Sequence, residues 1–374
     1  MKHGLLLATL CAFAAPLLLA APSPTHAIPE TDILLIGDRL NADIPNQARW
    51  ERFQKRYENL YGTEQAALLA DFHPIFKAAF GMTPEGKVED VESVAVSITL
   101  PKTLTAFELL DQDQWPEDLG IYCFVEYPEV NLTNVNTSIS RLLAENPDSG
   151  AKLTQNGSWT ALSPTDPAEA AGMPLIAWSP IARGFAFVLC KDYAKANQAV
   201  NNAVAPAPGS PLDAAFKAPS TQGPWGRFVI RDLSDLLDRY VTDPAERQEV
   251  MATMPFIFQT HGLIASLFYR ADGTLQLEVK AITNSAAEAL QARDMLITTK
   301  VMIRQGVVPQ FYGTPYADLF SGIIDSARCE AEGNAATLTL SLTPDQAEAL
   351  LDFIAVIQST PTEEEAELPF DDYE

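Results

Sequence analysis

Apolar and polar residues alternate along several short segments, and each alternating segment is followed by apolar residues at helical spacing. From residue 336 to residue 342 every second residue is apolar, which predicts a strand. Thr343 and Gln346 then form a capping box around Pro344, which stands at the first helical position. The helix that follows is predicted to pack through Ala347, Leu350, Leu351 and Ile354.

The segment from residue 275 to residue 297 repeats this pattern of a strand followed by a helix. Ser285 and Glu288 form the same capping box. The Asp-Gly pair at residues 272 and 273 predicts a tight turn that joins this strand to the one before it. The buried face of the predicted helix consists of Ala286, Ala289, Leu290 and Ile297.

The first half of the chain contains two further segments of this kind. In residues 185–204, Asp192 is the predicted N-cap of a helix. That helix is expected to bury Ala196, Ala199, Val200 and Ala203. The segment 120–143 places Leu132, Val135, Ile139 and Leu142 on one helical face, although its Asn and Thr residues are poor helix formers.

The order of these segments predicts an α+β fold with two similar halves. Each half is expected to be a mainly antiparallel sheet with helices on one face, in the order strand, helix, strand, strand, helix, strand, helix. The first six elements resemble the split β-α-β order of ferredoxin-like folds. Duplication explains this shared order, and convergence is the alternative because any two α+β segments contain strands that lead into helices.

The composition of the ends and the middle predicts the boundaries of these units. Residues 1–27 have the basic start, apolar run and small residues of a signal peptide, with a mature chain from Ile28 and an uncleaved anchor as the alternative. The expected location is periplasmic or extracellular. The predicted units are a first α+β domain at 28–204, a linker rich in Pro and Ala at 205–226, a second α+β domain at 227–358 and a disordered acidic tail at 359–374.

The net charge of −24 excludes whole classes of partner. Nucleic acids and anionic membrane surfaces require clustered Lys and Arg, so we expect neither as a partner. After cleavage we expect no membrane span.

The mature chain keeps Cys123, Cys190 and Cys329. These are expected to be three reduced thiols, with a bridge between Cys123 and Cys190 as the alternative.

The motifs of common catalytic and cofactor sites are missing from the sequence. His73 and His261 stand apart from any nucleophile motif, and no zinc-binding pair or glycine-rich phosphate loop occurs. An acidic loop at Asp111, Asp113, Glu117 and Asp118 suggests irregular calcium binding, or simply a solvated loop. The sequence therefore predicts no catalytic residue, no cofactor and no metal site.

The tryptophans are the remaining candidates for recognition. Trp115, Trp159, Trp178 and Trp225 fall in or near predicted loops, where they either bind a partner or cover the edge of a core. We predict a non-enzymatic envelope protein that binds a protein, a glycan or another envelope component in a cleft between its halves. A hydrolase with two carboxylates and a carrier of a lipid or other apolar molecule are the alternatives.

Overall fold

The computed structural model describes ten stretches of the chain, namely residues 31–38, 92–102, 115–127, 130–145, 147–166, 172–181, 183–201, 225–253, 257–306 and 308–359. The strands are β1 (Ile33–Asp38), β2 (Ser93–Thr99), β3 (Gly120–Glu126), β4 (Ala151–Asn156), β5 (Trp159–Pro164), β6 (Leu175–Ile181), β7 (Gly184–Cys190), β8 (Trp225–Ile230), β9 (Thr260–Tyr269), β10 (Leu275–Thr283), β11 (Arg328–Glu332) and β12 (Ala335–Leu342). The α-helices are α4 (Leu132–Glu145), α5 (Tyr193–Asn201), α7 (Leu233–Tyr240), α8 (Pro244–Thr253), α9 (Ala286–Gly306), α10 (Tyr316–Ser326) and α11 (Pro344–Ser359). Short 3-10 helices occur at η1 (Pro147–Ser149), η2 (Ile257–Gln259) and η3 (Val308–Phe311).

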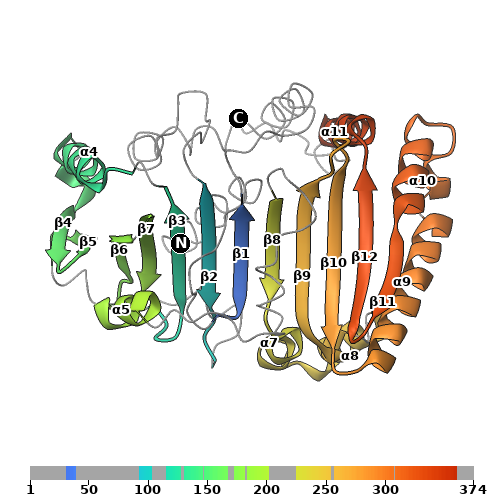
Figure 1. Cartoon of the computed structure of the whole chain (residues 1–374), viewed down its shortest axis with the longest axis horizontal. Helices are drawn as coiled ribbons and strands as arrows, with labels where there is room; N and C mark the ends of the chain where they lie inside the picture. The colour runs from blue at the N-terminus through green and yellow to red at the C-terminus, as the bar shows by residue number, and fades with distance from the viewer. Residues whose placement is uncertain are drawn as a thin grey trace, which may run out of the picture.

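The described strands form two antiparallel sheets of six strands each. Sheet I has the order β2-β3-β7-β6-β5-β4, and sheet II has the order β1-β8-β9-β10-β12-β11. Strands β1 and β2 lie side by side, so the sheets join edge to edge into one large twisted sheet (Figure 1). The expectation of an α+β protein built on mainly antiparallel pairing is confirmed.

Asp32, just ahead of β1, connects β1 to the end of β2. Its backbone N–H donates to the carbonyl of Ile98 at 3.0 Å, and its Oδ2 accepts from the backbone N–H of Leu100 at 2.8 Å. Its Oδ1 accepts from Arg239 Nη2 at 2.9 Å and lies 3.4 Å from Arg231 Nη2. We call Asp32, Leu100, Arg231 and Arg239 the Asp32 clasp.

The Asp32 clasp also anchors α7 to the joint between the sheets. Asp232 caps this helix, because its side chain accepts from the backbone N–H of Asp235. At the other end of α7, the hydroxyl of Tyr240 donates to the carbonyl of Pro101 at 2.6 Å. Burial lowers the pKa of Arg239, but the hydrogen bond and charge of Asp32 outweigh this effect, so that pKa lies above its ordinary value.

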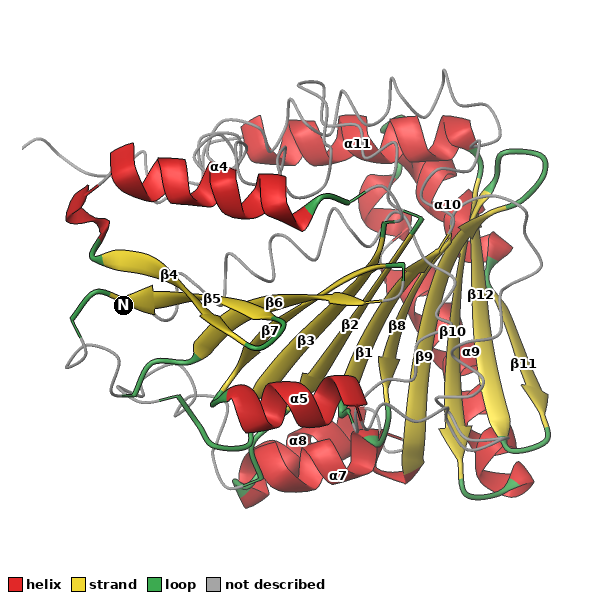
Figure 2. Ribbon diagram, turned by 60° about the vertical axis from the view of Figure 1, so that its left-hand side comes forward, coloured by secondary structure: helices red, strands yellow, loops and turns green. Residues whose placement is uncertain are grey.

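Helices cover both faces of sheet I. Successive residues of β7 point to opposite faces: Phe187 packs towards Val135 and Ile139 of α4, whereas Val188 shares a cluster with Ala196 of α5. In Figure 2, α4 and α11 run along the upper side of the large joined sheet. Helices α5, α7 and α8 lie together below it, near the lower ends of its strands. The predicted arrangement with helices on one face is therefore wrong for the first half, because both faces of its strands are apolar and each needs a cover.

Several local predictions are confirmed. Asp192 caps α5, since its Oδ1 accepts from the backbone N–H of Lys195 at 2.9 Å. Thr343 and Gln346 exchange hydrogen bonds between side chain and backbone at 3.2 and 2.9 Å, as a capping box requires. The turn between β9 and β10 has Gly273 at φ 83°, a conformation that glycine adopts without strain.

The predicted buried face of α9 is wrong. Ala289 is buried as expected, but Ala286 is exposed, and the side chains of Leu290 and Ile297 are 45% and 42% exposed. The helix contacts β11 and β12 and buries Ala289 and Ala292. Two alanines on one face allow a close approach to the sheet, whereas Leu290 and Ile297 point away from it.

Parts of the predicted organisation lie outside the described residues. These are the signal peptide at 1–27, most of the linker, and the acidic tail beyond Ser359. The predicted linker ends two residues too late, because β8 begins at Trp225. The ferredoxin-like order of the two halves is not confirmed, since residues 39–91 lie outside the described part and a hairpin, β4–β5, adds to the first half. Within the described residues, no helix has both the length and the apolar character that crossing a membrane requires.

The three cysteines in the described part of the chain are free thiols. Cys123 pairs in register with Phe187 and faces the α4 side, whereas Cys190 belongs to the cluster beneath α5. A disulfide needs Cβ atoms that point towards each other, so this arrangement favours the reduced state over the Cys123–Cys190 bridge. Burial raises the pKa of Cys123 to about 12 and that of Cys190 to about 11.

We expect Cys329 to be alkylated first when the native protein is treated with iodoacetamide at pH 8. It lies on β11, an edge strand of sheet II, whereas Cys123 and Cys190 lie on interior strands of sheet I. Burial raises the pKa of all three thiols, and it raises those of Cys123 and Cys190 to about 12 and about 11, which keeps these two in the unreactive thiol form. Peptide mass spectrometry after timed alkylation measures this order. Denaturation without a reductant should make all three thiols reactive, and recovery of a linked Cys123–Cys190 peptide would contradict the assignment.

Candidate functional site

Helix α4 forms one wall of a groove on sheet I. Asn131 caps it, because its Oδ1 accepts from the backbone N–H of Asn134 at 3.2 Å and its carbonyl accepts from that of Val135 at 3.1 Å. Val135 and Ile139 are buried against the sheet, which confirms that part of the predicted stripe. The apolar stripe fixes the helix on the strands, and the polar residues near its N-terminus border the groove.

A row of residues across three strands forms the floor beneath α4. Gln155 of β4 is opposite Thr160 of β5, and Thr160 is opposite Trp178 of β6. Residues paired in register share a face of the sheet, so all three point towards α4. Thr160 and Trp178 are buried, and Gln155 is exposed at the outer end of the row.

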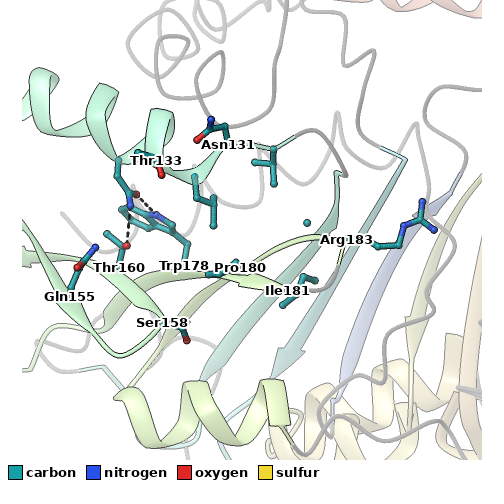
Figure 3. A pocket seen from close by; sticks show the side chains of 13 residues that line it. Asn131, Thr133, Gln155, Ser158, Thr160, Trp178, Pro180, Ile181 and Arg183 are labelled. Atoms are coloured by element: carbon teal, nitrogen blue, oxygen red, sulfur yellow. Dashed lines mark hydrogen bonds between the residues drawn. The ribbon is translucent and has the colours of Figure 1, made fainter.

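Asn136 connects the helix to this row. Its Oδ1 accepts from Trp178 Nε1 at 2.8 Å, and its Nδ2 donates to Thr160 Oγ1 at 3.2 Å (Figure 3). Both ends of the amide are therefore engaged, which fixes its orientation. A primary amide has two donor hydrogens and two acceptor lone pairs, so one of each remains for a ligand.

The groove opens where β5 separates from β6. The backbone pairing between them covers Thr160–Leu162 of β5 and Ile176–Trp178 of β6. The turn between β4 and β5, with Gly157 at φ 62°, lies just beyond this paired region. At the separation, the hydroxyls of Ser158 and Ser179 are 2.9 Å apart. The result is an open groove of about 630 Å³, which we call the α4 groove, lined by Val130, Asn131, Leu132, Thr133, Asn136, Gln155, Ser158, Thr160, Trp178, Pro180, Ile181, Arg183 and Gly184.

Arg183 is the ionisable residue of this lining, and two carboxylates engage it. Its Nη2 lies 2.7 Å from Glu92 Oε2, and its Nη1 lies 3.1 Å from Glu126 Oε1. Glu126 is 2% exposed and also accepts from the Ser93 hydroxyl at 2.6 Å. In Figure 3 the Arg183 side chain points away from Trp178 and Asn131. Its guanidinium therefore pairs with Glu92 and Glu126 at the rim and does not point into the groove.

Gly184 lets strands β3 and β7 approach closely at this rim. A Cβ atom there would lie 1.9 Å from the Val125 carbonyl oxygen and 2.8 Å from the Tyr127 backbone nitrogen. The neighbouring carbonyl of Arg183 accepts from that same Tyr127 N–H at 2.8 Å. Any residue with a side chain would force the two backbones apart, so glycine is required at this position.

The candidate residues from the sequence do not converge on one site. Glu117 and Asp118 of the acidic loop pair with Lys191 and Lys195, at 2.8 and 3.7 Å, while Asp111 and Asp113 lie outside the described residues. Among the described residues, no cluster of three or more His, Cys, Asp and Glu side chains is placed to hold a metal ion. The ion pairs of Glu117 and Asp118 favour the solvated-loop interpretation.

Of the two candidate histidines, His73 lies outside the described residues. His261 is at the start of β9, with its Nδ1 3.6 Å from Asp232 Oδ2, the carboxylate that caps α7. This contact gives His261 a structural partner.

The tryptophans belong to strands more than to loops. Trp159, Trp178 and Trp225 are buried in β5, β6 and β8, and Trp115 is half-buried with its Nε1 donating to the Leu119 carbonyl. Three of the four therefore pack in cores, and Trp178 also contributes to the α4 groove. The spacing patterns in the sequence do not indicate Asn136, Gln155, Ser158 or Thr160 as site residues. The signal for Asn136 is the set of Asn residues in a segment that nevertheless forms a helix.

Comparisons with known proteins place the chain in no family. No protein-family model matches it, and no curated protein matches it. Among solved structures, crystal form I of TP0453 is similar, with 10% identical residues and a TM-score of 0.39 over 89% of this chain and 96% of that one. A TM-score below 0.5 is too low to assign a shared fold.

Proposed function

We propose that the chain is an exported, non-enzymatic binding protein of the cell envelope, periplasmic or secreted, and that the α4 groove holds its ligand. The observation that supports this function is the lining of the groove, where amides and hydroxyls from α4, β4 and β5 converge on an open space. Concave sites with a few fixed polar groups are typical of small-molecule recognition. The groove lies within the first half, whereas the sequence led us to expect a cleft between the halves.

The lining of the α4 groove gives the carboxylate hydrolase no support. Such an enzyme needs two carboxyl groups in its pocket, and none is present among the described lining residues. Two acids in the described part, Asp32 and Glu126, are buried, and each is paired with arginine. Paired buried acids are typical of structural ion pairs.

The carrier of an apolar molecule is also less well supported. A carrier needs an enclosed apolar cavity of a few hundred Å³. The α4 groove is large enough, but it is open, and six of its lining residues have amide or hydroxyl side chains, namely Asn131, Thr133, Asn136, Gln155, Ser158 and Thr160. A bound lipid chain would leave the remaining donors and acceptors, such as those of Gln155 and Asn136, without partners, which is unfavourable.

The proposal includes a duplicated origin for the two halves. The order β1-β2-β3-β7-β6 corresponds to β8-β9-β10-β12-β11, and β1 pairs antiparallel with β8, as two copies related by a two-fold axis would. The hairpin β4–β5 extends sheet I beyond β6, and no described strand occupies the matching position beyond β11. The α4 groove depends on this hairpin, so the proposed site is in the part where the halves differ.

The test is untargeted mass spectrometry of small molecules that co-purify with the mature protein from its own host. Thr133→Trp adds bulk to a residue of α4 that lines the α4 groove, and Thr137→Trp adds the same bulk one turn further along α4, at an exposed position that does not line it. We expect one or more compounds with the wild type and with Thr137→Trp, and their loss from Thr133→Trp. Identical profiles for all three proteins, or no bound compound at all, would overturn the proposed function.

A further inference from the structure

We infer that the α4 groove binds a neutral oligosaccharide. This inference rests on the proposed function and adds the chemical class of the ligand. It is supported by three properties of the described lining: its charge, its hydrogen-bonding groups and its apolar residues.

The charge of the lining favours a neutral ligand. An anion would need an available cation, but Arg183 is held between Glu92 and Glu126, so this group of three has a formal charge of −1. A cation or a metal would need carboxylates, and the described lining has none. A groove whose one described charged residue is already paired is therefore suited to molecules without charge.

The hydrogen-bonding groups match hydroxyls. Asn136 keeps one donor and one acceptor after its bonds to Trp178 and Thr160, and Gln155 makes no side-chain hydrogen bond to any described residue. Side-chain amides both donate and accept, as sugar hydroxyls do. The spacing across neighbouring strands, roughly 5 Å from Gln155 to Thr160, is suited to the successive polar groups of one sugar ring.

Apolar residues also line the groove. Val130 and Leu132 precede and begin α4, and Pro180 and Ile181 end β6 where β5 has separated. Sugar rings present C–H groups on their faces as well as hydroxyls at their edges, so a lining with both polar and apolar residues fits both. A peptide is typically held by backbone hydrogen bonds to an exposed strand edge, whereas Gln155, Thr160 and Trp178 present side chains from a sheet face.

The groove is ordered before a ligand arrives. Asn136 is fixed by two hydrogen bonds, Trp178 and Thr160 are buried, and α4 is held by its own apolar stripe. A ligand therefore does not have to order these groups, which removes part of the entropic cost of binding. Gln155 is the exposed member of the row, and its removal leaves this fixed framework in place.

The experiment is titration calorimetry on the mature protein with maltohexaose, cellohexaose and fully N-acetylated chitohexaose as neutral probes. An oligogalacturonate of six residues and an acetylated, amidated neutral hexapeptide serve as the contrasting probes. Gln155→Ala removes one groove amide, and Gln291→Ala makes the same change at an exposed position of α9. We expect a neutral hexasaccharide to bind the wild type and Gln291→Ala alike, and Gln155→Ala about fivefold more weakly, as for one lost hydrogen bond.

Other outcomes separate the inference from the proposed function. Absence of binding by all three neutral hexasaccharides, or equal binding to the groove-filling Thr133→Trp variant, would overturn the inference. Binding of the oligogalacturonate or the peptide that Thr133→Trp abolishes would also overturn it, while leaving the proposed binding function intact. The proposed function fails separately, if no compound co-purifies in a way that depends on the groove.

Discussion

Replacing Asp32 with alanine should lower the free energy of unfolding by about 3–5 kcal/mol, the usual cost of removing one partner of a buried ion pair. The carboxylate is 9% exposed and accepts hydrogen bonds from Arg239 and from the backbone N–H of Leu100. Without it, Arg239 keeps a guanidinium that is 14% exposed, with a buried Nε that has no hydrogen-bond partner among the described residues. Urea unfolding followed by circular dichroism measures the change.

Asp235→Ala is the matched control for this variant. Asp235 pairs with the same Nη2 of Arg239 at 2.8 Å, but its side chain is 54% exposed. Removing an exposed partner at i and i+4 should change stability by less than about 1 kcal/mol. If Asp32→Ala and Asp235→Ala lower the free energy of unfolding by the same amount, the Asp32 clasp contributes no more to stability than a surface ion pair does.

Replacing Gly184 with alanine should destabilise the protein by about 3 kcal/mol and also weaken ligand binding in the α4 groove. The added Cβ would meet the carbonyl oxygen of Val125, a backbone atom that moves only if strand β3 moves. The shift would break the hydrogen bond from Tyr127 N–H to the Arg183 carbonyl. Thermal unfolding and calorimetry on the same variant measure both effects.

Gly306→Ala provides the comparison for the glycine variant. Gly306 ends α9, and a Cβ atom there would meet nothing within 4 Å. The change should leave stability within about 1 kcal/mol of the wild type and is expected to raise it slightly, because alanine restricts the unfolded chain. A Gly184→Ala protein as stable as Gly306→Ala would contradict the close approach of β3 and β7.

The sequence predicted the local elements where short-range chemistry decides them. Thr343 with Gln346 and Asp192 supply helix caps that depend on residues two to four positions away, and the structure contains them. The hairpin at Gly273 follows from its Asp-Gly pair in the same way. Such signals do not depend on the rest of the fold, so they can be read from a single chain.

The packing of helices was harder to predict, because it depends on the partner surface. Helix α9 has apolar residues on several sides, including Leu290, Ile297 and Val301, and only contact with β11 and β12 selects the face of Ala289 and Ala292. A spacing pattern counts apolar residues but does not compare their sizes. Close packing of a helix on a sheet here favours the smallest of them.

The candidate site was not predictable from spacing, because its residues come from separate elements. Asn136 is 24 residues from Thr160 and 42 from Trp178, and only the register of β4, β5 and β6 brings the row together. The tryptophans were assigned to loops, since single aromatic residues next to Pro, Gly and Ser resemble turns. A helix that retains Asn136 on its sheet side was the available signal.

The ladder between β1 and β8 has a consequence for the order in which the chain folds. Asp32 and Arg231, which meet beside this ladder, are 199 positions apart in the sequence. During synthesis from the N-terminus, β1 emerges long before β8, its partner on this edge. Long-range pairing of this kind is slow and leaves open edges that aggregate. Among the described strands of the first half, none pairs with this edge of β1, so a chain cut off before β8 should be more prone to aggregate than the full chain.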